Sequence, residues 1–337
     1  MNASIPDFGL STAFTRTAGI EAPLICGAMY PCSNPELIAA VSAAGGIGIV
    51  QPISMVYVHG HDLRVGLRMI RSITDKPIGF NALIEKSVKA YEERMRGWID
   101  VALEEGVRFF ITALGNPRWV VDRVHAVGGT VYHDVTERRW ALKAVDGGVD
   151  GLICVNNRAG GHAGSLSRER LHEDLQDLGL PLICAGGVGD PRSFAEALKI
   201  GYAGAQLGTR FIATAECKAH DEYKQAILDA GEDDIVLTVK LSGVPVSVIR
   251  TPYVERIGTD AGPVARWLLR NRRTKHWMRS FYALRSLRTL KHASLEGSAY
   301  RDYWQAGKSV ETIRQIEPAG EIVRRFAEHA AERLSTG

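Results

Sequence analysis

Between about residue 20 and residue 230, short apolar runs alternate with stretches of amphipathic helical pattern. One helix-like segment separates each consecutive pair of runs, which is the pattern of parallel strands joined by right-handed helical crossovers. The predicted strands are PLICG from residue 23, GIGIVQ from 46, PIGFN from 77, RFFIT from 108, TVYHD from 130, GLICVN from 151, PLICAGG from 181 and GAQLGT from 204.

These runs are almost continuously apolar, without in/out alternation, which indicates strands buried on both faces by a helical layer. Eight βα units within roughly 210 residues fit a closed barrel better than an open sheet, so the predicted class is α/β, a (β/α)8 TIM barrel. An open doubly wound sheet is the alternative fold. It would normally place a G-x-G-x-x-G turn after its first strand, and GAMYPCSNPE lacks that motif.

The βα rhythm ends near residue 230, so we expect a barrel of residues 20–230 and a C-terminal extension of residues 231–337 packed on it. The segment IVLTVKLSGVPVSVIR, from residue 235, predicts extra β structure or a lid. Residues 261–295 predict helix, and EPAGEIVRRFAEHAAERL, from residue 317, predicts a closing amphipathic helix. No low-complexity linker separates these segments from the barrel, so one domain is expected.

Composition excludes several classes of protein. A formal charge of +3 is too small to imply a nucleic-acid partner for the whole molecule, and no segment resembles a leader or a membrane span. The cysteines are odd in number, and Cys26, Cys154 and Cys184 lie in apolar runs, which predicts buried free thiols in a reducing cytoplasm. No metal site is expected, because His59 and His61 stand without carboxylate or cysteine partners; P-loop, CxxC, HExxH and G-x-S-x-G motifs are also missing.

Glycine-rich loops follow the seventh and eighth predicted strands, where barrels of this type usually bind phosphate. Glycine lets the backbone approach an anion closely, and a threonine hydroxyl can add a donor. We call residues 185–189 and 208–209 the phosphate cradle, although either loop alone would also serve as a tight βα turn. Arg210 fits either a phosphate or a structural carboxylate. The predicted binding residues are Ala185, Gly186, Gly187, Gly208 and Thr209.

The loop after the sixth predicted strand carries a histidine among glycines, in the sequence NNRAGGHAG from residue 156. His162 therefore stands at the carboxyl end of a barrel strand, where catalytic groups of such barrels usually lie. Its ordinary pKa allows proton exchange near neutral pH, so His162 is the predicted acid or base. His133, near the end of the fifth strand, is expected to face the same barrel mouth and is a second candidate, or else a structural partner.

Three further strand ends are expected at this mouth. Gly27, Ala28 and Met29, after the first strand, offer free backbone amides and an apolar side chain suited to the edge and face of a flat ring. Asn81 ends the third strand and Gln51 closes the second, and each has a side-chain donor and acceptor. The alternatives are core packing for Met29 and turn roles for Asn81 and Gln51.

These motifs resemble the nitronate monooxygenase (2-nitropropane dioxygenase) family, which includes a flavin-dependent type of enoyl-acyl-carrier-protein reductase. The most specific signals are AGGHAG at 159–164 and ICAGGVGD together with QLGTRF. Similarity runs from about residue 20 to 255 and resumes weakly at YWQAGKS and the last helix. The resemblance implies bound FMN, with His162 as acid or base beside flavin N5. It also implies flavin contacts at Gly27, Ala28, Met29, Asn81, Gly160, Gly161, Ala185, Gly186, Gly187, Gly208 and Thr209.

The chain departs from the family pattern in two places. Asn156, Asn157 and Arg158 precede the AGGH motif where nitronate-oxidising members carry other residues, and residues 261–295 contain nine Lys or Arg and no acidic residue. A fixed basic helix could bind the phosphates of an acyl-CoA or a pyridine nucleotide, and a solvated helix face is the alternative. With this basic segment, the chain is similar to NADH-using flavin oxidoreductases of bacterial steroid-ring degradation, which act on CoA thioesters. The predicted substrate-binding residues are Arg272, Arg273 and Arg279.

Three hypotheses of function follow. The first is an FMN-dependent oxidoreductase, reduced by NAD(P)H and acting on a bulky anionic small molecule such as an acyl-CoA. The second is a nitronate monooxygenase that oxidises alkyl nitronates with O2. The third is a non-catalytic protein that binds a phosphate-bearing ligand. A homodimer is a candidate assembly.

Overall fold

In a computed structural model, the protein folds into a closed barrel of eight parallel strands. The structure describes residues 7–84, 89–240, 244–260, 290–296 and 303–335. The strands follow one another in chain order, and β1 pairs with both β2 and β8. This closure confirms the (β/α)8 barrel and shows that the open doubly wound alternative is wrong. The strands are β1 (Leu24–Cys26), β2 (Ile47–Val50), β3 (Ile78–Leu83), β4 (Phe109–Ala113), β5 (Thr130–Val135), β6 (Gly151–Val155), β7 (Leu182–Ala185) and β8 (Gly204–Leu207).

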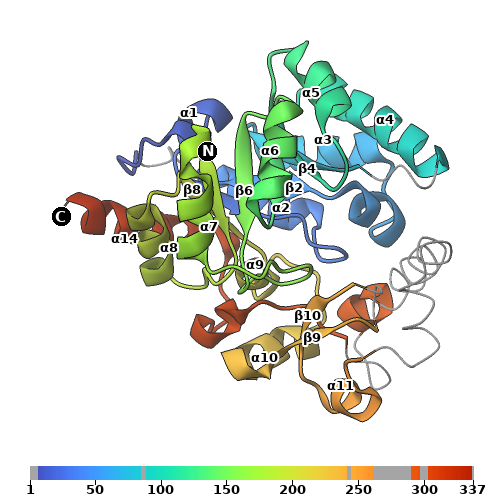
Figure 1. Cartoon of the computed structure of the whole chain (residues 1–337). Helices are drawn as coiled ribbons and strands as arrows, with labels where there is room; N and C mark the ends of the chain where they lie inside the picture. Colours follow the sequence, from blue (N-terminus) through green and yellow to red (C-terminus); the bar gives the residue numbers. More distant parts are fainter. Residues whose placement is uncertain (1–6, 85–88, 241–243, 261–289, 297–302, 336–337) are drawn as a thin grey trace.

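Helices surround the barrel on its outer side (Figure 1). Several begin at the signals that the sequence carries. Asp190 caps α8 through its side chain, and Pro191 occupies the first turn of that helix. The helices of the barrel are α1 (Ala13–Ala18), α2 (Pro35–Ala43), α3 (Leu63–Ile73), α4 (Lys89–Glu104), α5 (Arg118–His125), α6 (Arg138–Asp146), α7 (Arg168–Leu175), α8 (Pro191–Ile200), α9 (Thr209–Ile212) and α10 (Asp221–Asp229), with a π-helix η1 (Ser54–Val58) after β2 and a short η2 (Gln176–Leu178) after α7.

Successive residues of each strand face opposite sides of the sheet. Ile111 and Ile153 belong to a cluster that contains strand residues of one parity together with Phe14 of α1, and this cluster fills the inside of the barrel. The Phe14 ring lies 5.6 Å from that of Phe109, so α1 closes the amino-terminal end. Residues of the other parity, such as Phe80, pack in a second cluster with the helices. This parity decides which side chains reach the barrel mouth, the carboxyl-terminal end of the strands.

The first part of the C-terminal extension lies at the mouth. Strands β9 (Ile235–Thr238) and β10 (Val246–Ile249) pair antiparallel, which confirms the extra β structure predicted there. In Figure 1 they lie with α10 and α11 (Pro252–Ile257) at the end of the barrel opposite α1. Short turns η3 (Glu232–Asp234) and η4 (Lys308–Thr312) accompany them. The extension therefore borders the loops that follow the barrel strands.

The closing helix α14 (Ala319–Ser335) is present as predicted, and it packs against α8 and α2. Phe326 is completely buried, and its ring lies 5.9 Å from that of Phe194 in α8. Residues 290–295 are helical. The predicted substrate-binding residues Arg272, Arg273 and Arg279 lie outside the described residues.

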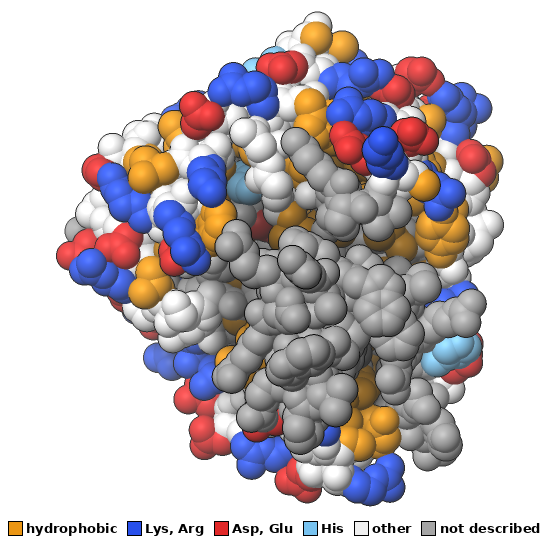
Figure 2. Space-filling view, turned by 45° about the vertical axis from the view of Figure 1, so that its right-hand side comes forward, with side chains coloured by type: hydrophobic (Ala, Val, Ile, Leu, Met, Phe, Trp, Pro, Cys, Tyr) orange, Lys and Arg blue, Asp and Glu red, His pale blue; other side chains and the backbone are white. Residues whose placement is uncertain are grey.

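Charges are mixed on the face that Figure 2 shows: among the described residues, Lys and Arg alternate with Asp and Glu. Cys26, Cys154 and Cys184 are buried and free of disulfides, as predicted, and so are Cys32 and Cys217. Of the helices that the structure describes, none combines the length and the apolar character needed to cross a membrane.

Candidate active site

The two loops of the phosphate cradle lie side by side, because β7 and β8 are paired neighbours. Gly186 and Gly187 have φ angles of 116° and 75°, a region that side chains rarely adopt. A Cβ on Gly186 would lie 2.5 Å from Asn156 Oδ1 and 2.6 Å from the Ala159 nitrogen, so only glycine fits there. Gly208 precedes α9, a short helix after the eighth strand of the kind that completes phosphate sites in these barrels.

Asn156 joins the cradle to the histidine loop. Its buried amide nitrogen donates to the Gly186 carbonyl at 2.9 Å, and its Oδ1 accepts from the Arg158 N–H at 2.8 Å. In the sequence, Asn156 stands out only as a departure from the family pattern. Its place directly after a strand, before a glycine-rich loop, was the available signal for this positioning role.

His162 lies on the loop after β6, and its side chain is exposed to solvent. The neighbouring Gly161 has a φ of 67°, and its carbonyl accepts from the Ser247 N–H of β10 at 2.8 Å. The extension thus holds the loop that carries the histidine. The surrounding protein removes part of the imidazole's hydration and lowers the pKa of His162, so at pH 7 the ring is neutral and can accept a proton.

A segment of the extension crosses between the histidine loop and the cradle. The Gly307 N–H donates to Thr209 Oγ1 at 3.0 Å, and the Lys308 N–H donates to the Arg158 carbonyl at 2.9 Å. A Cβ on Gly307 would lie 2.6 Å from the Gly160 nitrogen. We call residues 303–308 the strap. The strap fixes the distance between the histidine loop and the cradle. No local sequence pattern predicts these contacts.

Polar side chains line the inside of the mouth. By strand parity, Asn81, Asp134 and Gln206 face inward, and each has a buried oxygen without a hydrogen-bond partner among the described residues. Buried acceptors are normally matched by donors. Gln51 differs, because its Oε1 accepts from the Ser54 N–H at 2.6 Å, which gives it the turn role that the sequence had left open.

The flavin has the donors that the amide oxygens of Asn81 and Gln206 lack: a ring N3–H and the ribityl hydroxyls. Its phosphate is the anion that the cradle would take, with glycine backbone at positions where a Cβ would not fit. The residues present at the mouth therefore fit FMN.

The loop after β1 differs in one respect from the prediction. The Gly27 N–H donates to the Leu207 carbonyl at 3.0 Å, and the Met29 N–H donates to Ser33 Oγ at 2.9 Å. These two amides are therefore used within the protein and are not free: the Gly27 amide is bonded to the neighbouring strand β8, and the Met29 amide to its own loop. Ala28 packs against the inner cluster, and the Met29 sulfur lies 3.6 Å from the place of a Cβ on Gly208. The loop thus borders the cradle through side chains.

His133 does not face the mouth, contrary to the expectation. It has the parity of Val131 and Val135, whose side chains pack toward the helices. Its Nδ1 lies 2.8 Å from Thr112 Oγ1, and burial lowers the pKa of the imidazole to about 4. The structure gives His133 the alternative role, that of a structural partner, and the inward position at this strand end belongs to Asp134.

Arg210 proves to be structural. It is 2% exposed, and it donates to the carbonyls of Ala213 and Gln315 at 2.6 and 2.7 Å. Its guanidinium also pairs with Glu317 at 3.4 Å, just before α14. Arg210 therefore pairs with a structural carboxylate, and this contact ties α9 to the extension.

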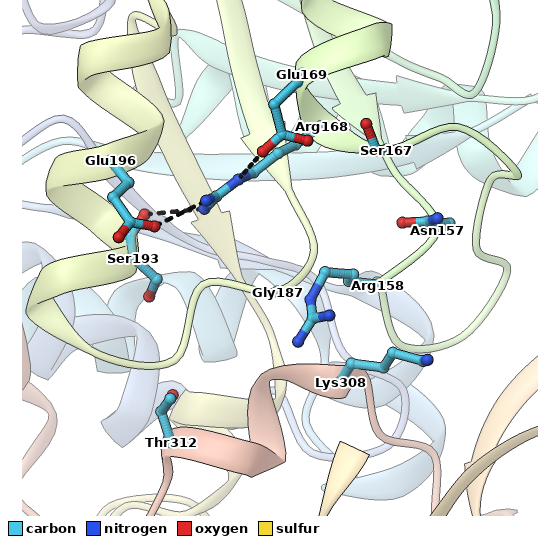
Figure 3. Close-up of a pocket in the computed structure, with 10 residues that line it drawn as sticks. All are labelled: Asn157, Arg158, Ser167, Arg168, Glu169, Gly187, Ser193, Glu196, Lys308 and Thr312. Atoms are coloured by element: carbon cyan, nitrogen blue, oxygen red, sulfur yellow. Dashed lines mark hydrogen bonds and ion pairs between the residues drawn. The ribbon is translucent and has the colours of Figure 1, made fainter. Parts of the chain in front are cut away.

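A cavity of about 470 Å³, lined mainly by polar and charged residues, borders Gly187 (Figure 3). Arg168 lies between Glu169 and Glu196, at 2.8 Å from each, and Arg158 donates to Glu232 at 2.5 Å. Both arginines are thus already paired with carboxylates. The cavity is lined by Asn157, Arg158, Ser167, Arg168, Glu169, Gly187, Ser193, Glu196, Lys308 and Thr312.

Comparison with known proteins agrees with this architecture. The family model described as nitronate monooxygenase matches residues 11–329. The chain is 31% identical to (3aS,4S,5R,7aS)-5-hydroxy-7a-methyl-1-oxo-octahydro-1H-indene-4-carboxyl-CoA dehydrogenase of Mycobacterium tuberculosis, over 76% of this chain and 70% of that protein. It is 29% identical to the nitronate monooxygenase of Pseudomonas aeruginosa, over 69% of this chain and 78% of the relative.

Among solved structures, FabK from Thermotoga maritima superposes with a TM-score of 0.79 at 27% identity, covering 97% of this chain and 98% of FabK. The match of the family model covers the barrel, the strap and most of α14, so it includes every part of the site described above. The chain therefore belongs to the nitronate monooxygenase family and is an oxidoreductase of this generally flavin-dependent group.

Proposed function

We propose that the protein is an FMN-dependent oxidoreductase that is reduced by NADH or NADPH and acts on a bulky anionic substrate, an acyl-CoA of the steroid-ring degradation type. One observation carries the proposal: a glycine cradle, inward acceptors that lack donors, and an accessible neutral imidazole share one end of a single barrel. The choice of substrate class is supported by the similarity to the mycobacterial dehydrogenase, whose name specifies a CoA thioester.

In this proposal the phosphate of FMN lies on the cradle, at Ala185, Gly186, Gly187, Gly208 and Thr209. Asn81 and Gln206 accept hydrogen bonds from the ring or the ribityl chain inside the mouth. The flavin contacts along the ring are Gly27, Ala28, Met29, Gly160 and Gly161.

Bound FMN would supply hydride exchange at its ring nitrogen N5. His162 would move the matching proton. The unprotonated nitrogen of its neutral imidazole accepts a proton from the substrate, and in the reverse direction the imidazole returns it. The hydrogen bond from Ser247 to Gly161 keeps the histidine loop in place, and the strap keeps it next to the cradle. Both contacts orient the imidazole without touching the substrate.

The extension would supply the remaining substrate contacts. We propose that residues 20–230 form the FMN-binding barrel and that residues 231–337 are an extension on it that completes the substrate site. Arg272, Arg273 and Arg279 are the proposed contacts to CoA phosphates, because guanidinium groups bind phosphate in a bidentate geometry.

An absorption spectrum of the purified protein, followed by anaerobic titration with NADH and NADPH, tests the proposal. We expect a flavin spectrum that either nucleotide bleaches and that an unsaturated acyl-CoA restores. The second candidate, a nitronate monooxygenase, is favoured by the identity with the Pseudomonas enzyme. In that case a small alkyl nitronate bleaches the flavin and the nucleotides do not. A colourless protein that ignores added FMN would exclude both, and would leave a non-catalytic phosphate-ligand protein.

A further inference from the structure

Asp134 occupies an unusual place in the barrel. It is the one acidic residue within the bounds of the eight barrel strands, and it lies next to the last residue of β5. It shares the parity of Tyr132, which belongs to the inner cluster, and it is in register with Ile153, whose side chain is also inside. The carboxyl group therefore faces the lumen at the mouth, on the opposite side of the strand from His133.

The surroundings do not compensate a negative charge at this position. Asp134 Oδ1 is buried without a hydrogen-bond partner among the described residues, and no charged group among them acts on its carboxylate. The inward neighbours at the mouth, Gln51, Asn81 and Gln206, are neutral amides. Below them the lumen is lined by aliphatic and aromatic side chains.

Burial raises the pKa of Asp134 to about 7, with desolvation as its cause. On the neighbouring β6, the pKa of the buried Cys154 thiol is raised mainly by desolvation. The negative charge of Asp134 raises it further. His162, on the loop after β6, owes its lowered pKa to desolvation alone. On β4 the adjacent residues, Thr112 and Ala113, do not titrate. No charged group in the described residues thus stabilises an ionised Asp134.

We propose that Asp134 is a proton-holding residue of the barrel mouth: in its neutral form it donates a hydrogen bond from inside the barrel to an acceptor atom of the bound flavin. The inference rests on the proposed function and adds to it. A neutral carboxyl group is a donor, whereas Asn81 and Gln206 present unmatched acceptor oxygens. Asp134 would therefore donate a hydrogen bond to a carbonyl oxygen or an unprotonated nitrogen of the ring. The amide oxygens cannot do this, because they only accept.

The test uses the holoenzyme and follows release of FMN on dilution, through the rise in free-flavin fluorescence, between pH 5.5 and 9. Between pH 6 and pH 9 we expect the Kd for FMN to rise at least tenfold more in the wild type than in Asp134→Asn. The reason is that ionisation of Asp134 removes its hydrogen-bond donor. The asparagine amide is a permanent donor, so this variant should keep a Kd close to that of the wild type at pH 6. Asp122→Asn, an exposed aspartate on α5, is the matched control and should follow the wild type.

A second measurement does not depend on FMN. Because the pKa of Asp134 is higher in the folded than in the unfolded state, the FMN-free wild type should lose thermal stability as pH rises from 5 to 8, and Asp134→Asn should lose less. Equal pH dependence of Kd in wild type and Asp134→Asn would overturn the inference while the proposed function stands. Failure of the wild type to bind FMN at any pH would remove the proposed function, and the flavin contact of Asp134 with it.

Discussion

At the scale of single residues, two histidines at neighbouring strand ends have opposite environments. His162 lies exposed on a loop held by β10, whereas His133 is buried against Thr112 on the outer side of the sheet. Both imidazoles are neutral at pH 7, because desolvation lowers both pKa values. Only the ring that a substrate can reach is able to exchange a proton with it.

Replacing His162 by Ala should leave FMN bound and slow the substrate half-reaction by about 10²–10⁴-fold, the usual contribution of a general acid or base. Stopped-flow absorbance of the flavin measures this rate. In the wild type the rate should be constant above pH 7 and fall on acidification, because protonation removes the base. A variant as fast as the wild type would remove His162 from the mechanism.

Replacing His133 by Ala should keep FMN and turnover, and should lower the free energy of unfolding by about 1–3 kcal/mol, because Thr112 loses its buried partner. The pKa of about 4 in the folded state lies below the ordinary value of 6.5, so the wild type should lose stability as pH falls from 6.5 through 4. Denaturant unfolding at pH 7 and pH 4.5 measures both effects. The alanine variant should lack this acid-dependent loss, and a variant with normal stability but no turnover would contradict the structural role.

At the scale of elements, the site depends on how three loops and the strap fit together. Gly186 approaches Asn156 and Ala159 of the histidine loop, and Gly307 of the strap approaches Gly160. Each glycine lies where two segments far apart in the sequence pass at close range. The contacts between these loops, more than any single side chain, set the spacing of cradle and imidazole.

Gly186→Ala should therefore lose FMN, with a backbone strain of about 1–3 kcal/mol and a displaced histidine loop. Gly179→Ala is the matched control, because Gly179 also has a positive φ, 72°, but a Cβ there would meet nothing within 4 Å. That variant should be strained and still bind FMN. The ratio of flavin to protein after purification, together with the melting temperature, separates the two. Equal flavin content in both variants would show that close packing at Gly186 does not support the cradle.

At the scale of the whole molecule, the extension and the barrel share one core. Arg210 of α9 pairs with Glu317, and Phe326 of α14 packs on Phe194 of α8. The strap joins the loops after β6 and β8. We therefore expect barrel and extension to unfold together.

Phe326→Ala should cost about 3–5 kcal/mol, since it removes a fully buried ring between α14 and α8. The loss should appear in a single transition that also releases FMN, when far-ultraviolet circular dichroism and flavin fluorescence are followed together. Leu334→Ala, at an exposed position on the same helix, is the control and should change stability by less than about 0.5 kcal/mol. Separate transitions for helix and flavin would mean that the extension is an independent unit.

Much of this architecture could be predicted from the chain alone. Each predicted barrel strand overlaps an observed one, and the two loops of the cradle lie on neighbouring strands as expected. Strands buried on both sides leave continuous apolar runs and amphipathic helices leave a periodic pattern, each within a local stretch of residues. Their order and approximate bounds can therefore be predicted without knowledge of distant contacts.

Tertiary structure alone decided the orientation of side chains and the contacts between segments that are far apart in the sequence. His133 and Asp134 are adjacent in the chain, and only the closed sheet determines which of them faces the lumen. The sequence predicts free amides at Gly27 and Met29, whereas the fold bonds both within the protein. Arg210 finds its carboxylate at Glu317, far along the chain. Local periodicity carries no information on such pairings, because the free energy of burial and of hydrogen bonding depends on which segments the fold brings together.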